Sequence, residues 1–402
     1  MRILGAGSVA IASPFVALLC IGPSWVEAAP PALGPLSEPA PVCELRGEPK
    51  LVGRTRNGKG RLSSAVNALS GETVDVFLRV PGRLDGRRVI FSEDGAPGHI
   101  SWSESACAKV QIRWSQVEPT MEHLETPAPN VGLSIYANAR IFGPRHGAWL
   151  GYDRLEYREA KLGDADDLWS WSLADARPSD EQLAEAQGAL AGLGVMRLSA
   201  TITPVNGPPR RSPNASTRRR GQITDAVFRY TFRADDGLFG WLTTFFNVPY
   251  IFGSAGVGSR SQAERYIGAD CADVIVAALR LSGDDIAYTS VAGLVRALPR
   301  VAGPLEIPAS PGIDAPPYAP LPGDILAIDY IGASSLPRPW DHVVVFVEDR
   351  GAAEGGDGVL GPEDQVADIG DARGLRVSGL GDQGHVRVLA LRPRARTQPA
   401  RQ

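Results

Sequence analysis

The chain has 402 residues, of which 44% are hydrophobic and 21% are charged, and its formal net charge is −4. This balance excludes the intrinsically disordered class, which combines low hydrophobicity with high net charge. It also gives no general reason to expect nucleic acid or an anionic membrane as a partner. The length is that of two or three domains.

The N-terminus has the features of a secretion signal. Arg2 is followed by an uncharged apolar segment that Pro14 interrupts, and Val26 and Ala28 occupy the positions that signal peptidase reads. We therefore expect residues 1–28 to be a signal peptide and the mature protein to be exported, periplasmic or secreted, with no membrane span after cleavage. An uncleaved membrane helix is the alternative. The Pro-rich residues 29–41 are expected to be a linker.

The cysteines support an oxidising compartment and single out one thiol. Without Cys20 of the signal, three cysteines remain, so they form at most one disulfide bond. Cys43 and Cys107 both lie in the N-terminal half, each beside a predicted strand, and we expect them to pair. Cys271 is then left as a lone thiol.

Residues 42–235 have the alternation of a β-rich module. Apolar and polar residues alternate over 73–80, 109–114 and 133–142, which predicts antiparallel strands with one buried face, as in a sandwich or open barrel. Strand-like runs follow at 195–205 and 222–233.

One helix is expected to interrupt this module. It would begin at Ser179, with Gln182 as the capping-box partner, and end at Gly192 or Gly194.

A basic segment lies between the last two strand-like runs. Residues 210–220 carry five arginines and no acid. The segment is either a surface for a polyanion, such as teichoic acid or lipopolysaccharide, or a solvated mobile loop. Its adjacent prolines favour the loop.

The pattern changes at Asp235–Asp236, where we place a domain boundary. Residues 236–393 form the second predicted domain, and residues 394–402 are expected to be a flexible tail.

A predicted helix of the second domain begins with a cysteine. Asp270 can cap this helix, which starts at Cys271 and ends at Gly283. A cysteine in the first turn of a helix is helped towards the thiolate by the free N–H groups and the helix dipole. The alternative is a cysteine that is simply packed.

A histidine downstream favours chemistry at this thiol. His342 opens a predicted strand and, in an α+β fold, can lie beside the start of the helix. There it would act as a general base and form a thiolate–imidazolium pair with Cys271.

Four short strings in this half resemble the NlpC-type cell-wall cysteine peptidases, which are papain-like enzymes that cut peptidoglycan stem peptides. They occur in the family's order: VPYIFGS (248–254), GADCADVIVAAL (268–279), LPGDILAI (321–328) and DHVVVFVED (341–349). The resemblance covers about Asp236 to Arg392, while the N-terminal half resembles nothing that we can name. It implies an α+β protein whose C-terminal papain-like domain follows a β-rich, sandwich-like module.

The resemblance also implies roles for individual residues. Cys271 would be the nucleophile and His342 the base, while Tyr250 and the Cys271 N–H would polarise the scissile carbonyl. The family's third group lies on the next strand and orients the imidazole; Asp368 is the candidate and His385 the runner-up. A carboxylate there would fix the tautomer and stabilise the imidazolium.

The chain also departs from the family pattern. Ala272 and Asp273 replace the Ser-Gly that follows the cysteine, and Ser254 replaces the second glycine of the tyrosine motif. If the Asp273 carboxylate points inward, its charge opposes formation of the thiolate.

No cofactor or metal is predicted. The chain lacks a His-Glu-x-x-His motif and a second Cys/His cluster, and no P-loop motif follows the glycines at 253–258. The sequence therefore predicts an exported thiol-dependent amide hydrolase that acts on peptidoglycan or another peptide-like substrate. A papain-like amidase or acyltransferase and a non-catalytic envelope-binding protein remain as alternatives, and the oligomeric state is not predicted.

Overall fold

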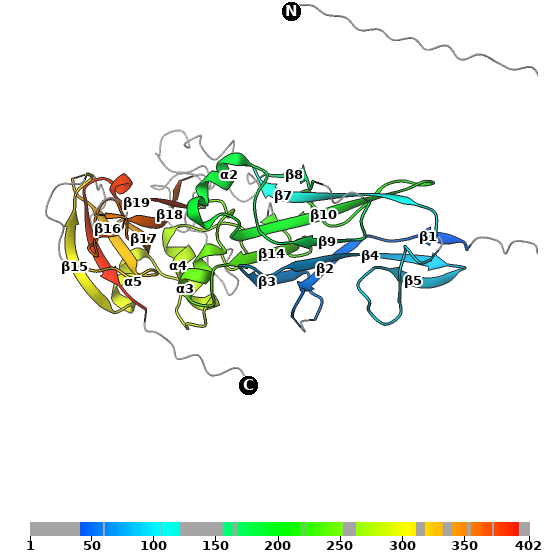
Figure 1. The fold of residues 1–402 in the computed structure, drawn as a ribbon, viewed down its shortest axis with the longest axis horizontal. Coiled ribbons are helices and arrows are strands. Elements are labelled where there is room, and N and C mark those ends of the chain that lie inside the picture. Colours follow the sequence, from blue (N-terminus) through cyan, green and yellow to red (C-terminus); the bar gives the residue numbers. More distant parts are fainter. Residues whose placement is uncertain are drawn as a thin grey trace, which may run out of the picture. The chain divides into compact units, whose positions relative to one another are not determined.

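Three β-sheets of six strands each, together with a two-stranded ribbon, organise the described part of the chain (Figure 1). The computed structural model describes residues 41–58, 61–105, 107–120, 156–163, 167–219, 222–251, 263–310, 318–332, 340–351, 355–371 and 374–393. The predicted signal peptide, nearly all of the predicted linker and the predicted tail therefore lie outside these ranges, as does the strand expected at 133–142. Within the ranges, no helix is long and apolar enough to cross a membrane.

Two of the sheets form a sandwich. The first contains β1 (Cys43–Leu45), β2 (Lys50–Thr55), β4 (Val74–Leu84), β5 (Arg87–Phe91), β6 (His99–Ile100) and β9 (Ser170–Leu173). The second contains β3 (Ala65–Leu69), β7 (Val110–Pro119), β8 (Tyr157–Lys161), β10 (Gly194–Pro204), β11 (Arg210–Arg211) and β14 (Phe228–Arg233). The ribbon pairs β12 (Arg218–Arg219) with β13 (Gln222–Ile223).

The inner faces of these two sheets pack closely because alternate residues are apolar. Leu78 of β4 and Trp114 of β7 are fully buried in one hydrophobic cluster. At Gly53 of β2 the sheets approach so closely that a Cβ atom would lie 2.8 Å from the ring of Phe228 on β14. Glycine is therefore required at this position by its lack of a side chain.

The predicted disulfide is confirmed. Cys43 and Cys107 are bonded, with their Cα atoms 5.7 Å apart, and the pair is separated by 64 positions in the sequence. Closing a loop of this length stabilises a fold by about 4 kcal/mol in the chain-entropy account. The bond is compatible with export, since disulfides persist in oxidising compartments.

The helix expected from Ser179 to Gly192 or Gly194 is shorter than predicted. Helix α2 covers only Glu181–Ala186, and the 3-10 turn η3 (Gly188–Leu190) follows it. Asp180, the residue before the helix, accepts from the Leu183 N–H at 3.4 Å, while the Ser179 hydroxyl donates to buried Glu118 on β7 at 2.7 Å. The helix therefore begins later than the sequence predicted, and Ser179 satisfies a buried carboxylate that needs hydrogen-bond donors.

The basic segment is also more regular than the loop that the sequence favoured. Its first two arginines form β11, which extends the second sheet by pairing Arg211 with Thr201 and Arg210 with Ile202. Arg218 and Arg219 form β12 of the ribbon. The prolines between the strands did not prevent pairing because Pro208 and Pro209 precede β11 and take no part in its hydrogen bonds.

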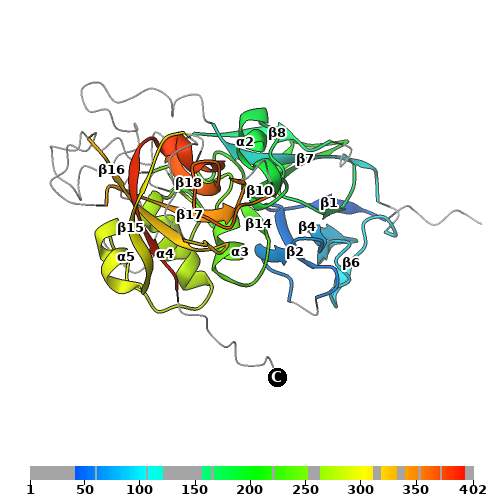
Figure 2. The same cartoon turned by 60° about the vertical axis from the view of Figure 1, so that its left-hand side comes forward.

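The C-terminal half places helices beside a third sheet, so the described chain is a mixed fold in which strands dominate (Figure 2). Its helices are α3 (Leu238–Thr243), α4 (Cys271–Leu281) and α5 (Val291–Ala297). Its sheet has the antiparallel order β15 (Arg300–Ile307), β20 (Val386–Leu391), β16 (Ile325–Tyr330), β17 (His342–Glu348), β18 (Gln365–Asp371) and β19 (Gly374–Gly379), and the 3-10 turn η4 (Leu380–Gln383) follows β19.

The sheet is buried on both faces, which explains the continuous apolar runs of its central strands. Val343 and Val345 belong to the cluster that also contains the buried residues of α4, whereas Val344 and Phe346 belong to a second cluster with Leu360. Residues 272–279 of α4 are all buried, as its all-round apolar sequence predicted.

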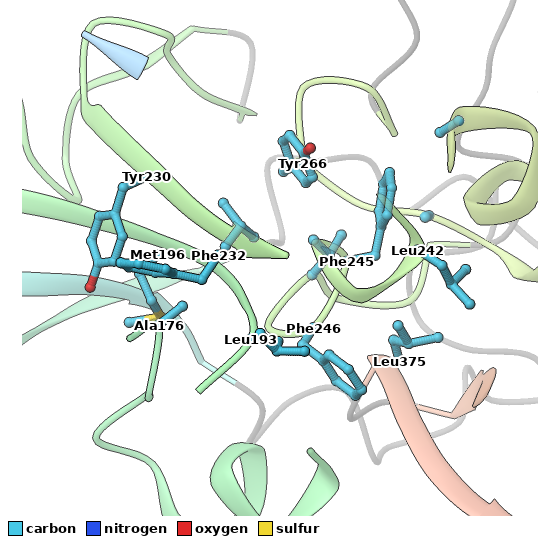
Figure 3. Packing of buried hydrophobic residues seen from close by; sticks show 14 of the residues in the cluster. Ala176, Leu193, Met196, Tyr230, Phe232, Leu242, Phe245, Phe246, Tyr266 and Leu375 are labelled. Atoms are coloured by element: carbon cyan, nitrogen blue, oxygen red, sulfur yellow. The ribbon is translucent and has the colours of Figure 1, made fainter. Parts of the chain in front are cut away.

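One hydrophobic cluster joins the sandwich to the C-terminal half. Figure 3 shows part of it, where residues of β10 and β14 meet residues of α3 and of the segment after it: Met196, Tyr230, Phe232, Leu242, Phe245 and Phe246. The boundary predicted at Asp235–Asp236 falls between β14 and α3, inside a single compact unit that spans 41–402. The β-rich half therefore shares its core with the half that contains Cys271.

A buried arginine strengthens this junction. Arg197 of β10 donates to the carbonyl oxygens of Tyr266 at 2.7 Å and of Arg265 at 3.2 Å. Tyr266 has a left-handed backbone (φ 55°), which is unfavourable for an aromatic residue. Its ring packs on Phe245 and lies 4.6 Å from the guanidinium carbon of Arg229. These contacts hold the chain in its strained conformation just before Cys271.

Replacing Arg197 with Met should lower the free energy of unfolding by about 2–3 kcal/mol, since charge-assisted hydrogen bonds to two buried carbonyl groups are lost. Urea unfolding followed by tryptophan fluorescence measures the change. Arg88→Met, on the exposed side of β5, is the matched control and should shift the free energy of unfolding by less than about 0.5 kcal/mol. Equal stability of Arg197→Met and the wild type would show that the junction does not depend on this arginine.

Candidate active site

Cys271 is the first residue of α4, as the sequence predicted. The Asp270 side chain caps the helix by accepting from the N–H groups of Ala272 at 3.1 Å and Asp273 at 2.9 Å. The Cys271 N–H belongs to the free first turn and donates to no other described residue. The thiol therefore lies at the positive end of a buried helix, half-buried itself, beside an amide that is still available as a donor.

His342 faces this thiol from the start of β17. Its side chain is buried, and its Nε2 lies 2.6 Å from Oδ1 of Asp368 on the neighbouring strand β18. The other ring nitrogen is left for Cys271, whose thiol lies close enough to raise the pKa of the imidazole. The structure thus brings Cys271, His342 and Asp368 into one continuous row.

An irregularity in β18 accommodates this row. The pairing of β18 with β19 shifts between Asp368 and Asp371, and such shifts re-aim side chains at the edge of a sheet. Gly370 lies in the shifted segment, where a Cβ atom would be 3.3 Å from Oδ1 of Asp368 and 3.6 Å from the His342 ring. The absence of a side chain leaves room for the imidazole and the carboxylate.

Three further residues hold the row in place, and sequence reasoning missed them. Gln383 of η4 donates to Oδ2 of Asp368 at 3.0 Å, and the Tyr330 hydroxyl donates to Oε1 of Gln383 at 3.0 Å. The Tyr330 ring also stacks on the His342 ring, with centroids 6.4 Å apart. A guanidinium nitrogen of Arg376 on β19 lies 3.6 Å from the same Oδ2 of Asp368. These residues come from separate elements, so no spacing in the sequence marks them.

The charges of the row favour an imidazolium. Burial alone would lower the pKa of His342, but Cys271 and the Asp368 carboxylate outweigh burial and raise it to about 10. Burial would raise the pKa of Asp368, but His342, Gln383 and Arg376 together lower it below its usual range. At neutral pH the imidazole is therefore charged and the carboxylate is ionised.

Two opposing effects act on the thiol. Burial raises the pKa of Cys271 above its ordinary value, and the charges of Asp270 and Asp368 add to this rise. The charge and hydrogen bond of His342 lower the pKa, and the helix N-terminus acts in the same direction. The reactivity of Cys271 therefore depends on His342.

Tyr250 also lies where the sequence predicted, close to the thiol. It forms an isolated parallel bridge with Ala269, two residues before Cys271. Burial raises the pKa of the Tyr250 phenol well above its ordinary value, with Cys271 as the strongest charge acting on it. The hydroxyl therefore stays protonated and can donate a hydrogen bond at neutral pH.

His385 and Asp273 occupy different environments. His385, the runner-up for the third group, is half-exposed and pairs with Glu306 at 2.8 Å, so it has no part in the row. The Asp273 side chain is buried, with 5% exposure. The carboxylates that most raise the pKa of the Cys271 thiol are instead Asp270 and Asp368.

The described residues contain no group of three histidine, cysteine, aspartate or glutamate side chains that could hold a metal ion. The row of Cys271, His342 and Asp368 has the groups for nucleophilic attack by sulfur with proton transfer through an imidazole.

Replacing His342 with Ala should slow the alkylation of Cys271 by iodoacetamide at pH 7 by at least about tenfold, because loss of the imidazolium raises the pKa of the thiol. The rate is measured by mass spectrometry across a pH series. His385→Ala, which removes an exposed histidine outside the row, should leave the profile unchanged. Identical profiles for wild type and His342→Ala would refute electrostatic coupling between the two side chains.

Replacing Asp368 with Asn should lower the pKa of His342 from about 10. Burial lowers this pKa, and the carboxylate charge that counteracts burial in the wild type is lost in the variant. NMR titration of the His342 ring protons measures this pKa. Asp329→Asn, whose carboxylate pairs with Arg387, is the control and should leave it unchanged.

The same change has a consequence for stability. In the wild type the folded-state pKa of His342 lies above its ordinary value of 6.5, so its stabilising contribution is complete below about pH 6.5 and is lost as the pH rises to about 10. In Asp368→Asn that loss should be smaller and should end at a lower pH. Parallel stability profiles for the two proteins between pH 6.5 and 10 would contradict the assignment.

Comparisons with protein-family models, with curated proteins and with solved structures find no match to this chain. The row places a cysteine at a helix N-terminus, a histidine at the start of a strand and an aspartate on the next strand. A nucleophile beside a base that a third group orients is an arrangement that can support nucleophilic catalysis by a thiol.

Proposed function

We propose that this protein is an exported thiol-dependent amide hydrolase. Cys271 is the nucleophile, His342 transfers protons, Asp368 orients the imidazole, and Tyr250 with the Cys271 N–H stabilises the oxyanion. The observation that carries the proposal is the buried hydrogen bond of 2.6 Å between His342 and Asp368, on an imidazole whose pKa the nearby thiol of Cys271 also raises. Buried groups with such strongly shifted pKa values gather at functional sites.

The proposed reaction proceeds in two halves. The sulfur of Cys271 attacks the carbonyl carbon, and the negative charge that develops on the oxygen accepts hydrogen bonds from the Cys271 N–H and the Tyr250 hydroxyl. The C–N bond then breaks, and the leaving amine takes the proton from His342. In the second half, His342 removes a proton from water, which attacks the thioester and releases the acid and the free thiol.

The substrate class rests on the resemblance to NlpC-type peptidases. Under this proposal the C-terminal half has a papain-like arrangement, and the substrate is a peptidoglycan stem peptide. The disulfide Cys43–Cys107 and the signal-like N-terminus are consistent with action outside the cytoplasm. An amidase or acyltransferase on another amide or ester would use the same row of residues.

A second candidate function is a non-catalytic envelope-binding protein. The raised pKa of Cys271 favours it, since burial and the carboxylates of Asp270 and Asp368 act against a thiolate. In that case Cys271 is a packed residue, and the function lies in the β-rich half.

Digestion of purified peptidoglycan by the mature protein tests the proposal. We expect new stem-peptide fragments by liquid chromatography and mass spectrometry. Cys271→Ala should abolish them, and His342→Ala should reduce their rate of release by at least about a hundredfold, the usual contribution of a general base. His385→Ala is the matched control and should retain the wild-type rate.

A parallel panel separates the alternatives. If the protein cleaves small peptide amides or esters but not peptidoglycan, and this cleavage depends on Cys271, the result would support an amidase or acyltransferase. The wild-type protein would be non-catalytic if it cleaved no substrate and its thiol reacted with iodoacetamide no faster than a free cysteine.

A further inference from the structure

The outer face of the second sheet carries a polar cavity, away from Cys271. Its volume is about 450 Å³, and the strands β7, β8, β10 and β11 line most of it. The opposite face of the same strands is the apolar interior of the sandwich, where Trp114 and Ile202 are buried. A solvated outer face is usual for an antiparallel sheet, but here the face is hollow and carries an uneven distribution of charge.

The register of the strands places two arginines on either side of a threonine. Thr201 of β10 lies directly opposite Arg113 of β7 on one side and Arg211 of β11 on the other. Directly opposed residues share a face, so the three side chains form one row across the sheet. The two arginine Cα atoms are separated by two strand spacings, about 10 Å.

Neither arginine is neutralised by a described residue. Arg113 and Arg211 are exposed and make no ion pair with any residue in the described ranges. The cavity also has two acidic residues: Asp167 accepts a hydrogen bond from the Ile112 N–H, and Glu159 shares β8 with Lys161, whose charge offsets it. The row across Thr201 therefore keeps two positive charges that face the same space.

We infer that this cavity binds a phosphodiester group of an anionic, hydroxyl-rich polymer. A tetrahedral phosphate offers oxygen atoms on two sides, so both guanidinium groups and the Thr201 hydroxyl can bond it at once. A planar carboxylate is instead satisfied by one bidentate arginine. A second row of polar side chains, Gln111 opposite Thr203, lies beside the arginines and can bond the hydroxyl groups of the chain.

The chemistry of the described lining favours a charged ligand over a neutral glycan. Its described residues are polar or charged apart from Ile112 and Pro209, and none of them is aromatic, so they offer no platform on which a neutral sugar ring could stack. The site is independent of the proposed hydrolase function, because it uses no residue of the Cys271 row. It would hold the protein on a phosphate-bearing polymer whether or not Cys271 is active.

Binding of fluorescently labelled glycerol-phosphate oligomers to the mature protein, followed by anisotropy, tests the inference. We expect saturable binding by the wild type that weakens as salt is added. The double variant Arg113→Gln/Arg211→Gln should raise Kd by at least about tenfold. Thr201→Val, which keeps both charges, should raise Kd by a smaller factor.

A control of equal charge makes the result specific. Arg87→Gln/Arg88→Gln removes two exposed arginines from β5 and should leave Kd unchanged, as should Cys271→Ala. Near-UV circular dichroism verifies that each variant is folded. Equal weakening by both double variants would overturn the inference by showing general electrostatic attraction. Equal affinity for polyglutamate, or no binding by the wild type, would overturn it as well.

Discussion

The burial of residues 272–279 of helix α4 is the constraint on which the candidate site depends. Asp270 fixes where the helix begins by accepting from the N–H groups of Ala272 and Asp273. Cys271 is thereby held at the edge of the core, where its own N–H is available as a donor. A displacement that moved the apolar residues of α4 out of the core would expose hydrophobic surface and lower the stability of the fold.

Electrostatic support for the site comes from a row of residues rather than from the helix alone. Asp368 is ionised because it accepts from His342 and Gln383 and lies near Arg376. Its charge holds the proton on the imidazole, and the imidazolium in turn opposes the effect of burial on the thiol. The protonation state of Cys271 therefore depends on residues of a strand and a 3-10 turn that are far from it in the sequence.

The β-rich half has two separate consequences for the molecule. Its inner face is part of the core that fixes the segment before Cys271, through Arg197 and the left-handed Tyr266. Its outer face carries the cavity with the row of Arg113, Thr201 and Arg211. A module that only tethered the protein would not need to share its core with the other half. The arrangement instead joins a surface for an anionic polymer rigidly to the candidate site.

Local sequence determined the features that depend on neighbouring residues. The start of α4 at Cys271, its cap Asp270, the strand that His342 opens and the pairing of Cys43 with Cys107 were all predictable, because periodicity, capping chemistry and cysteine arithmetic are local or countable. The choice of Asp368 over His385 was also indicated, but only through resemblance to a known arrangement. The length of α2 was predicted wrongly, because the chain leaves the α-helical conformation at Gly188, which has a left-handed φ of 51°. Only the tertiary structure decided the remainder: Tyr330, Arg376 and Gln383 converge on the imidazole from different elements, and Arg113 and Arg211 become neighbours of one threonine through strand register. Such convergence depends on how strands pair across long separations, which no local pattern encodes.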